Sequence, residues 1–317
     1  MASLTLLEMA KQARETGDIL KAGIVEQYAG NSPILDVIGF EERAGGVVEW
    51  LQEKTLPVMA NRAVNENFTA SSGEVEKRIE KVVIAGGEIK IDTAGLKLYG
   101  PNVLTTQISM SLKSLQLKWH SDFFNGDHAA NPKEFSGLKV RAGGTQLVQA
   151  GNTSGGDALS LSALRRAIAK VRPVNPRAQV RIYSNLELAL RYQDAISNPS
   201  ISGYVVQTKN DVGVEAPTFK GIPWYAIEED AEGDQILGFT EQGSGGGASV
   251  CSSIYIVAFS PEDLTGIQTG GIDVRDLGEM QTETKRLIRM DWLNNFATYN
   301  PRSFARLAGV KDAAFTA

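Results

Sequence analysis

The sequence contains few of the residues on which common enzymatic chemistry depends. It has one cysteine, Cys251, and two histidines, His120 and His128, in 317 residues. A single cysteine cannot form an intrachain disulfide, so nothing in the chain requires an oxidising compartment. Neither histidine has a cysteine or another histidine at the spacing of a zinc site. We interpret Cys251 as a small buried apolar residue and both histidines as ordinary structural or surface residues.

Motifs for phosphate, metal and nucleophile chemistry are also missing. The glycine run Gly243–Gly247 is followed by a strand-like segment and lacks a Gly-Lys-Ser/Thr sequence, so it predicts a hairpin tip and not a phosphate loop. The string Asp230-Ala-Glu232-Gly-Asp234 alternates oxygen donors but is not a complete calcium loop, and we interpret it as a solvated acidic turn. The sequence therefore predicts no catalytic, metal-binding or cofactor-binding residues, and it predicts that the protein is not an enzyme.

Charge and hydropathy exclude two further classes. Lys and Arg number 32 against 37 Asp and Glu, which gives a net charge of −5. A surface built to neutralise many phosphates is rich in Lys and Arg, so a dedicated nucleic-acid binder is disfavoured, although a local patch remains compatible with weak contact to DNA. No run of about 18 apolar residues is present, so we expect no transmembrane helix and no membrane partner.

The N-terminal residues read as an arm that needs a surface to lie on. The string Thr5-Leu-Leu-Glu8 fits a capping box at the start of one short amphipathic helix. Asp18 is a candidate N-cap for a second one. Two short helices bury little apolar surface by themselves.

Residues 47–92 read as one long β-hairpin. Its predicted strands are Val47–Leu56 and Val82–Ile91, and a polar stretch, Val58–Lys77, lies between them. Loops longer than about 12–15 residues are uncommon inside a compact domain. We therefore expect this segment to extend away from the globular body.

The remaining chain predicts one long helix, a compact α/β segment and a long ribbon. The helix, Pro101–Asn125, has apolar residues spaced by three or four positions: Ile108, Leu112, Leu115, Trp119 and Phe123. Helices and strands alternate after Asp157. Residues Thr282–Trp292 alternate in polarity over a length greater than that of most strands, which favours a ribbon.

This order of parts resembles the HK97-fold major capsid proteins of tailed bacteriophages. Local strings that are similar to those of the family are Arg62-Ala-Val-Asn-Glu66, Phe124-Asn-Gly-Asp127, Glu134-Phe-Ser-Gly-Leu138 and Gly221-Ile-Pro-Trp224. The resemblance covers nearly the whole chain and implies an α+β fold. Its parts would be an N-terminal arm (1–46), an E-loop hairpin (47–92), a P-domain with spine helix and β-ribbon (93–156 and 266–317) and an α/β A-domain (157–265).

The resemblance also implies a function. The chain would self-assemble into hexamers and pentamers of an icosahedral or prolate head shell, built in the host bacterial cytoplasm and located in the virion capsid. Implied partners are other copies, a portal protein, a separate scaffolding protein, an optional decoration protein and packaged double-stranded DNA held by non-specific contact. Candidate inter-subunit residues in the E-loop are Arg62, Asn65, Glu66, Phe68, Glu74, Lys77 and Arg78.

Two alternatives remain open from the sequence. An encapsulin, which is a bacterial nanocompartment shell protein, has the same fold. A soluble α/β enzyme with an acidic site near Glu228–Asp234 would belong to a different class.

Overall fold

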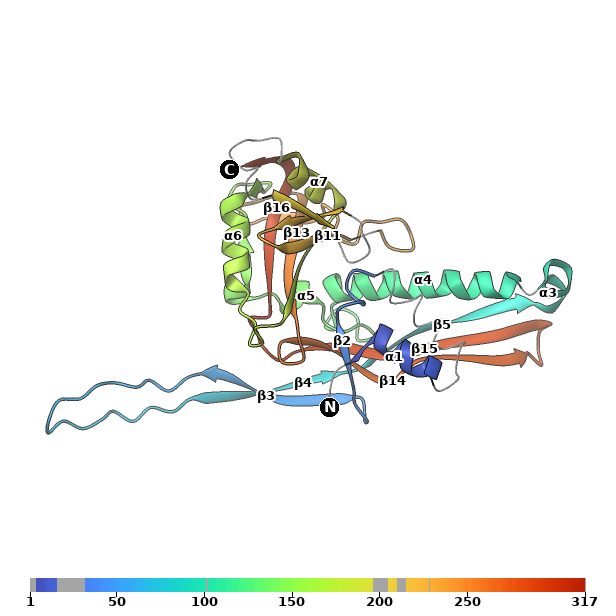
Figure 1. The fold of residues 1–317 in the computed structure, drawn as a ribbon, viewed down its shortest axis with the longest axis horizontal. Helices are drawn as coiled ribbons and strands as arrows, with labels where there is room; N and C mark the ends of the chain where they lie inside the picture. The colour runs from blue at the N-terminus through green and yellow to red at the C-terminus, as the bar shows by residue number, and fades with distance from the viewer. Residues whose placement is uncertain are drawn as a thin grey trace.

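The computed structural model describes residues 4–15, 32–100, 102–195, 205–209, 215–227 and 229–316. Figure 1 shows a compact upper part, an elongated lower part and a hairpin that projects beyond both. The arm helix predicted to begin at Asp18 lies outside the described residues.

The N-terminal segment confirms the predicted capping box. Strand β1 (Leu4–Thr5) leads directly into helix α1 (Leu6–Glu15). The Thr5 backbone N–H donates to Glu8 Oε2 at 2.8 Å, and the Glu8 N–H donates to Thr5 Oγ1 at 3.3 Å. Strand β1 pairs with β2 (Gly39–Glu42), and β2 pairs in parallel with a long strand of the lower part. The first residues of the arm therefore lie against the body of the same chain.

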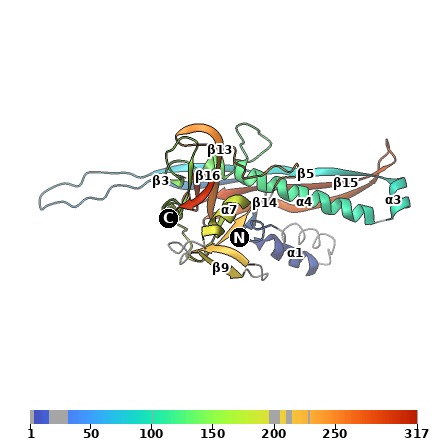
Figure 2. The ribbon, with the colours of Figure 1, turned by 90° about the horizontal axis from the view of Figure 1, so that it is seen from above.

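The lower part is built from a long helix and a long ribbon, as the sequence predicts. Strand β14 (Leu264–Glu279) pairs antiparallel with β15 (Lys285–Thr298), and β5 (Val83–Asp92) adds a third strand on the far side of β15. Helix α4 (Asn102–Asn125) runs along this sheet, with the short helix α3 (Thr93–Tyr99) before it (Figure 1, Figure 2). No helix in the described part of the chain is long and apolar enough to cross a membrane.

The projecting hairpin differs from its predicted boundaries. Strand β3 (Val47–Thr55) pairs with β4 (Glu74–Lys81) in a separate two-stranded sheet. The assignment of Val82–Ile91 to this hairpin is wrong, because those residues form most of β5 and pair with β15. A Cβ atom at Gly86 would lie 2.1 Å from the Met290 carbonyl oxygen, so the glycine permits the close approach of the two strands.

The upper part is a mixed α/β structure, as predicted. Its strands are β6 (Leu147–Gln149), β7 (Asp157–Ser160), β8 (Gln179–Ser184), β9 (Val205–Lys209), β10 (Glu215–Phe219), β11 (Ile222–Ala226), β12 (Glu241–Gly243), β13 (Gly246–Phe259) and β16 (Phe304–Thr316). Its helices are α5 (Leu138–Arg141), the 3-10 turn η1 (Gly144–Gln146), α6 (Leu161–Lys170) and α7 (Leu186–Asp194). Part of the sheet runs in the order β14-β13-β8-β11-β10-β9.

Two hydrophobic cores share strand β13. Side chains alternate between the faces of a strand, so Tyr255 and Val257 enter the first core while Ile254 and Ile256 enter the second. The first core lies between α4 and the long strands, and the second lies beneath α6 and α7. The shared strand couples the upper and lower parts mechanically.

Two strands cross the predicted division between P-domain and A-domain. Residues 304–316, grouped with the P-domain in the prediction, form β16, which pairs with β13 and places Leu307 and Val310 in the second core. Strand β6, from the predicted range 93–156, pairs with β16. Because β13 is buried, its edge opposite β8 needs a partner for its backbone groups, and β16 supplies it. The division as a whole stays a prediction.

We predict that Trp119→Ala lowers the free energy of unfolding by about 3–5 kcal/mol. Trp119 is 1% exposed and packs between α4 and the ribbon, with its ring 5.0 Å from Phe123 and 6.4 Å from Trp292. Urea unfolding of the unassembled subunit measures the change. Met110→Ala is the matched control, because Met110 lies on the same helix and is 61% exposed. If both substitutions changed the free energy of unfolding by a similar, near-zero amount, the buried position of Trp119 would be contradicted.

Candidate assembly interface

The inner face of the projecting hairpin rests on the body of its own chain. The Trp50 ring meets the Tyr299 ring at 5.1 Å in an edge-to-face arrangement. Gln52 Nε2 donates to the Tyr299 carbonyl oxygen at 3.3 Å. Val48, next to them, is buried against Ile267. These contacts fix the base of the hairpin and its direction.

A partly buried ion pair completes this anchor. Glu80 of β4 lies 2.7 Å from Arg141 Nη1, and the Arg141 guanidinium covers the Phe296 ring at 4.1 Å. The guanidinium also donates to the carbonyl oxygens of Phe296 and Ser136. Burial lowers the pKa of Arg141, and the Glu80 carboxylate opposes that shift. Removing Glu80 would leave a buried cation without its counterion, which is costly.

The outer face of the hairpin carries exposed apolar side chains, which alternate with charged ones such as Glu49 and Lys77. Directly opposite residues of an antiparallel pair share a face, so Leu51, Glu53, Val75 and Ile79 lie on the side away from Trp50. Leu51 is 70% exposed, Val75 65% and Ile79 49%. One hairpin therefore carries an inner face whose base is covered by its own chain, and an outer face that the described part of the chain leaves open.

The hairpin tip brings four of the predicted contact residues together. The Arg62 guanidinium lies 5.1 Å from the Phe68 ring centroid and donates to the Glu66 carbonyl oxygen at 3.1 Å. Glu66 Oε2 accepts the Ala63 N–H at 2.9 Å, and Asn65 adopts a positive φ of 72° at the turn. These contacts shape a tip whose outward surface includes Phe68, which is 65% exposed.

The other three predicted residues form ion pairs within the hairpin. The pairs are Glu74 with Lys54 at 3.0 Å, Lys77 with Glu49 at 2.6 Å and Arg78 with Glu76 at 3.0 Å. Exposed pairs of this kind contribute only about 0–1 kcal/mol. The first two join the two strands of the hairpin, whereas Arg78 and Glu76 lie on the same strand. Contact of all seven residues with a neighbouring subunit stays a prediction.

Sequence reasoning missed the apolar outer face. Val75 and Ile79 stand four residues apart within the charged string Glu74–Lys81, which reads as a polar loop. They become neighbours of Leu51 only when β4 pairs with β3.

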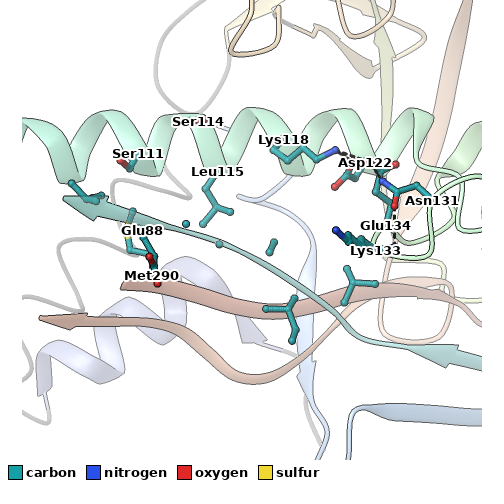
Figure 3. Close-up of a pocket in the computed structure, with 16 residues that line it drawn as sticks. Glu88, Ser111, Ser114, Leu115, Lys118, Asp122, Asn131, Lys133, Glu134 and Met290 are labelled. Carbon is teal, nitrogen blue, oxygen red and sulfur yellow. Dashed lines mark hydrogen bonds and ion pairs between the residues drawn. The ribbon is translucent and has the colours of Figure 1, made fainter. Parts of the chain in front are cut away.

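A groove between α4 and β5 is the second notable surface of the lower part (Figure 3). It encloses about 570 Å³, and its apolar lining includes Leu115, Ile89 and Met290. Residues of both elements and of the loop after α4 surround it. The groove is open to solvent and suits an extended apolar segment better than a small polar substrate.

Charged groups at one end of the groove form an ion-pair cluster. Lys118 Nζ lies 2.8 Å from Asp122 Oδ1 and 2.9 Å from Glu134 Oε1, and Asn131 Nδ2 donates to the same Glu134 oxygen (Figure 3). Burial raises the pKa of Asp122. Burial alone would lower the Lys118 pKa, but the two carboxylates outweigh it and raise the value. The cluster fastens the loop to α4. Lys133, at its edge, has no ion pair among the described residues.

The acidic turn holds its carboxylates towards solvent. Asp230 Oδ1 accepts the N–H groups of Glu232 and Asp234 at 3.0 and 2.9 Å, so this side chain shapes the turn. Glu229, Glu232 and Asp234 are exposed, and Glu228 lies outside the described residues. Within the described ranges, no group of three or more His, Cys, Asp or Glu side chains is placed to hold a metal ion.

The other residues considered as candidates for catalysis or ligand binding make structural contacts. Cys251 is fully buried, burial raises the pKa of its thiol, and its Sγ donates to the Gly155 carbonyl oxygen. His128 Nδ1 lies 2.8 Å from the Glu134 carbonyl oxygen. The run Gly243–Gly247 closes the β12–β13 hairpin, so its interpretation as a hairpin tip is confirmed.

His120 joins the arm to the long helix. It is buried, and its Nε2 lies 2.6 Å from Ser32 Oγ. The Ser32 oxygen already accepts the N–H groups of Ile34 and Leu35, so its own proton is available to a neutral His120 ring. Burial lowers the pKa of His120 to about 4. The His120 ring is therefore neutral in the folded protein at neutral pH.

Comparison with known proteins gives matches in structure only. No family model and no curated protein matches the sequence. The holo-SrpI encapsulin complex of Synechococcus elongatus matches at a TM-score of 0.63, with 11% identity over 90% of each chain. A structure from Microbacterium phage Oxtober96 matches at 0.59, with 10% identity over 88% of this chain and 91% of the other. The capsid of an empty GTA particle matches at 0.53, with 10% identity over 87% and 88%.

At these identities, the likeness establishes the fold. The chain has the HK97-like capsid fold, an α+β architecture, and the match extends over about nine tenths of its length. The fold class predicted from the sequence is confirmed.

We predict that the subunit loses stability as the pH falls below about 6.5, partly through His120. Its folded-state pKa of about 4 lies below the ordinary value of about 6.5, so the unfolded chain binds the proton more readily. The contribution of the neutral His120 ring to the free energy of unfolding is complete above pH 6.5. It falls by about 3 kcal/mol as the pH approaches 4. Urea unfolding at several pH values measures it. His120→Asn should flatten this dependence relative to the parent protein, and identical pH profiles for the two proteins would contradict the assignment.

Proposed function

We propose that the protein is the major capsid protein of a tailed bacteriophage. It self-assembles into hexamers and pentamers that form the head shell around packaged double-stranded DNA. It acts through contacts between copies and not through catalysis. Its place is the virion capsid, and its assembly takes place in the host bacterial cytoplasm with a portal protein, a separate scaffolding protein and an optional decoration protein.

The observation that carries this proposal is the two-faced hairpin. Its inner face is anchored by Trp50 and Glu80, while Leu51, Val75 and Ile79 are exposed on its outer face. Burying one such side chain contributes about 1.5–3 kcal/mol. A two-stranded hairpin is only marginally stable by itself in water. Contact with a second copy would both bury the apolar face and order the tip.

The groove beside α4 is the surface that we propose to receive a neighbouring hairpin. Its apolar lining residues, including Leu115 and Ile89, match the apolar side chains Leu51, Val75 and Ile79 on the outer face of β3 and β4. Glu53 on that face and Lys133 at the groove each lack an ion pair within the described residues and have opposite charges. Donor and receiver are different surfaces of the same chain, so the contact propagates from subunit to subunit, as the rings of a shell require.

An encapsulin-type shell is the second candidate function. The TM-score of 0.63 to the SrpI encapsulin supports it. The two candidates differ in what the shell encloses. Electron microscopy of the purified chain, alone and with its portal and scaffolding proteins, separates them: heads filled with DNA support the capsid protein, and small shells that enclose protein support the encapsulin. A compact monomer with a saturable small-molecule activity would contradict both and favour the enzyme hypothesis.

We predict that deletion of Met59–Ser72 abolishes shell assembly and leaves the subunit folded. The deletion removes the tip, whereas the anchors Trp50 and Glu80 and both hydrophobic cores remain. Electron microscopy counts closed shells, and circular dichroism with urea unfolding checks the fold. Normal shells from the deletion variant would contradict the hairpin's role.

We predict that the double variant Leu51→Ser, Val75→Ser raises the concentration needed for assembly by at least about tenfold, since two exposed apolar side chains lose their burial between copies. Analytical ultracentrifugation measures this concentration. Leu98→Ser is the matched control, because Leu98 is 77% exposed and lies on α3 at the opposite end of the molecule. An unchanged assembly concentration for the double variant would contradict the proposed contact.

A further inference from the structure

The upper part of the molecule carries an exposed cationic flank. Between Asp157 and Glu187 the sequence has six Lys and Arg residues and no Asp or Glu, in a chain whose net charge is −5. Arg166 and Lys170 are four residues apart on α6 and therefore share one face of that helix. Arg172 follows directly. All three side chains are exposed, and none has an ion pair within the described ranges.

The surface around these cations is shaped as well as charged. A shallow hollow of about 360 Å³ lies along α6, lined by Leu161, Ser162, Arg165, Arg166 and Ala169. The small side chains Ser162 and Ala169 leave space between the arginines. A protruding turn of another chain fits such a hollow better than a flat surface does.

The upper part also carries an acidic flank, formed by the turn after β11. Its exposed carboxylates, Glu229, Glu232 and Asp234, have no ion pair among the described residues. The turn is held in place, because Gln235 Nε2 donates to Glu187 of α7 at 2.6 Å. The Asp230 side chain fixes its backbone from within. The carboxylates are therefore presented on a rigid support.

The two flanks face different directions. Figure 1 shows α6 on one side of the upper part and α7, to which the acidic turn is tied, on the other. The three exposed cations and the three exposed carboxylates are thus equal in number and opposite in charge, but the body of the upper part separates them. Two complementary surfaces on opposite sides of one subunit suit a head-to-tail contact, which is the kind of contact that builds rings when the rotation between copies closes.

We propose that the acidic turn, residues 229–234, of one copy docks on helix α6 of the next copy around each ring of subunits. This inference rests on the proposed shell function and names a contact of the upper part, separate from the hairpin contact of the lower part. Each exposed ion pair contributes little, but repetition in every subunit sets the register of the ring and repels wrong orientations.

A second copy fits the cationic flank better than nucleic acid does. Phosphate binding draws its affinity from many cations that neutralise many phosphates. Here Arg166 lines a hollow whose other walls are partly apolar and small, Lys170 and Arg172 follow it along the chain, and the same chain supplies three exposed carboxylates. DNA is the competing partner for this flank, and the assembly experiment distinguishes it from a second copy.

A charge-reversal cycle on the full chain tests the proposal. One variant carries Arg166→Glu and Lys170→Glu, a second carries Glu229→Lys and Glu232→Lys, and a third carries all four changes. We expect each double variant to raise the assembly concentration about tenfold at low salt, and the fourfold variant to recover most of the loss. Analytical ultracentrifugation and electron microscopy provide the readout. Circular dichroism of the unassembled subunits checks that each variant folds.

The control is Lys97→Glu, which reverses an exposed charge on α3 at the far end of the molecule. Combining Lys97→Glu with Glu229→Lys and Glu232→Lys should not restore the assembly concentration of the parent protein. Failure of the fourfold variant to assemble better than either double variant would overturn the proposal, while shells from the parent chain would still support the proposed function. Normal assembly of the α6 variant combined with loss of DNA retention would assign the flank to nucleic acid and would also overturn it.

Discussion

A two-stranded ribbon has two faces, and its own chain covers only one face of β3 and β4. On the inner side, Trp50 packs on Tyr299 and Glu80 pairs with the buried Arg141. The outer side leaves Leu51 and Val75 exposed. The body of the subunit thus fixes the direction of the hairpin but cannot complete its burial. The proposed shell function depends on this asymmetry, because a contact that cannot be closed within one chain must be closed between chains.

The rest of the fold supplies a rigid base for such contacts. Strand β13 contributes alternate side chains to both hydrophobic cores, so the upper and lower parts do not move independently of the sheet that joins them. The arm is fastened by Ser32 and His120, and the hairpin by Arg141. Hairpin and acidic turn then project from this base in different directions, and each has a complementary surface elsewhere on the same chain. A subunit with such pairs of surfaces is suited to head-to-tail rings.

The sequence predicted the parts of the fold that depend on local patterns. The apolar stripe from Ile108 to Phe123 identified α4, and Thr5 with Glu8 identified the start of α1. Strand pairing was less accessible, because it depends on contacts distant in sequence. The apolar alternation of Val82–Ile91 was correctly read as a strand, but its partner is β15, some 200 positions later, which no local pattern encodes. The true return strand, Glu74–Lys81, is so rich in charge that it reads as a loop. For the same reason the candidate site was predicted as charged residues, and the exposed apolar face was missed.

Hydrogen exchange of the hairpin before and after assembly tests the central claim most directly. An isolated two-stranded hairpin opens readily, so amides of Glu74–Lys81 should exchange rapidly in the unassembled subunit. In closed shells the same amides should exchange far more slowly, because a neighbouring copy covers the outer face. Slow exchange of Glu74–Lys81 in the free subunit, or unchanged rapid exchange in the shell, would show that the hairpin is not completed by another copy.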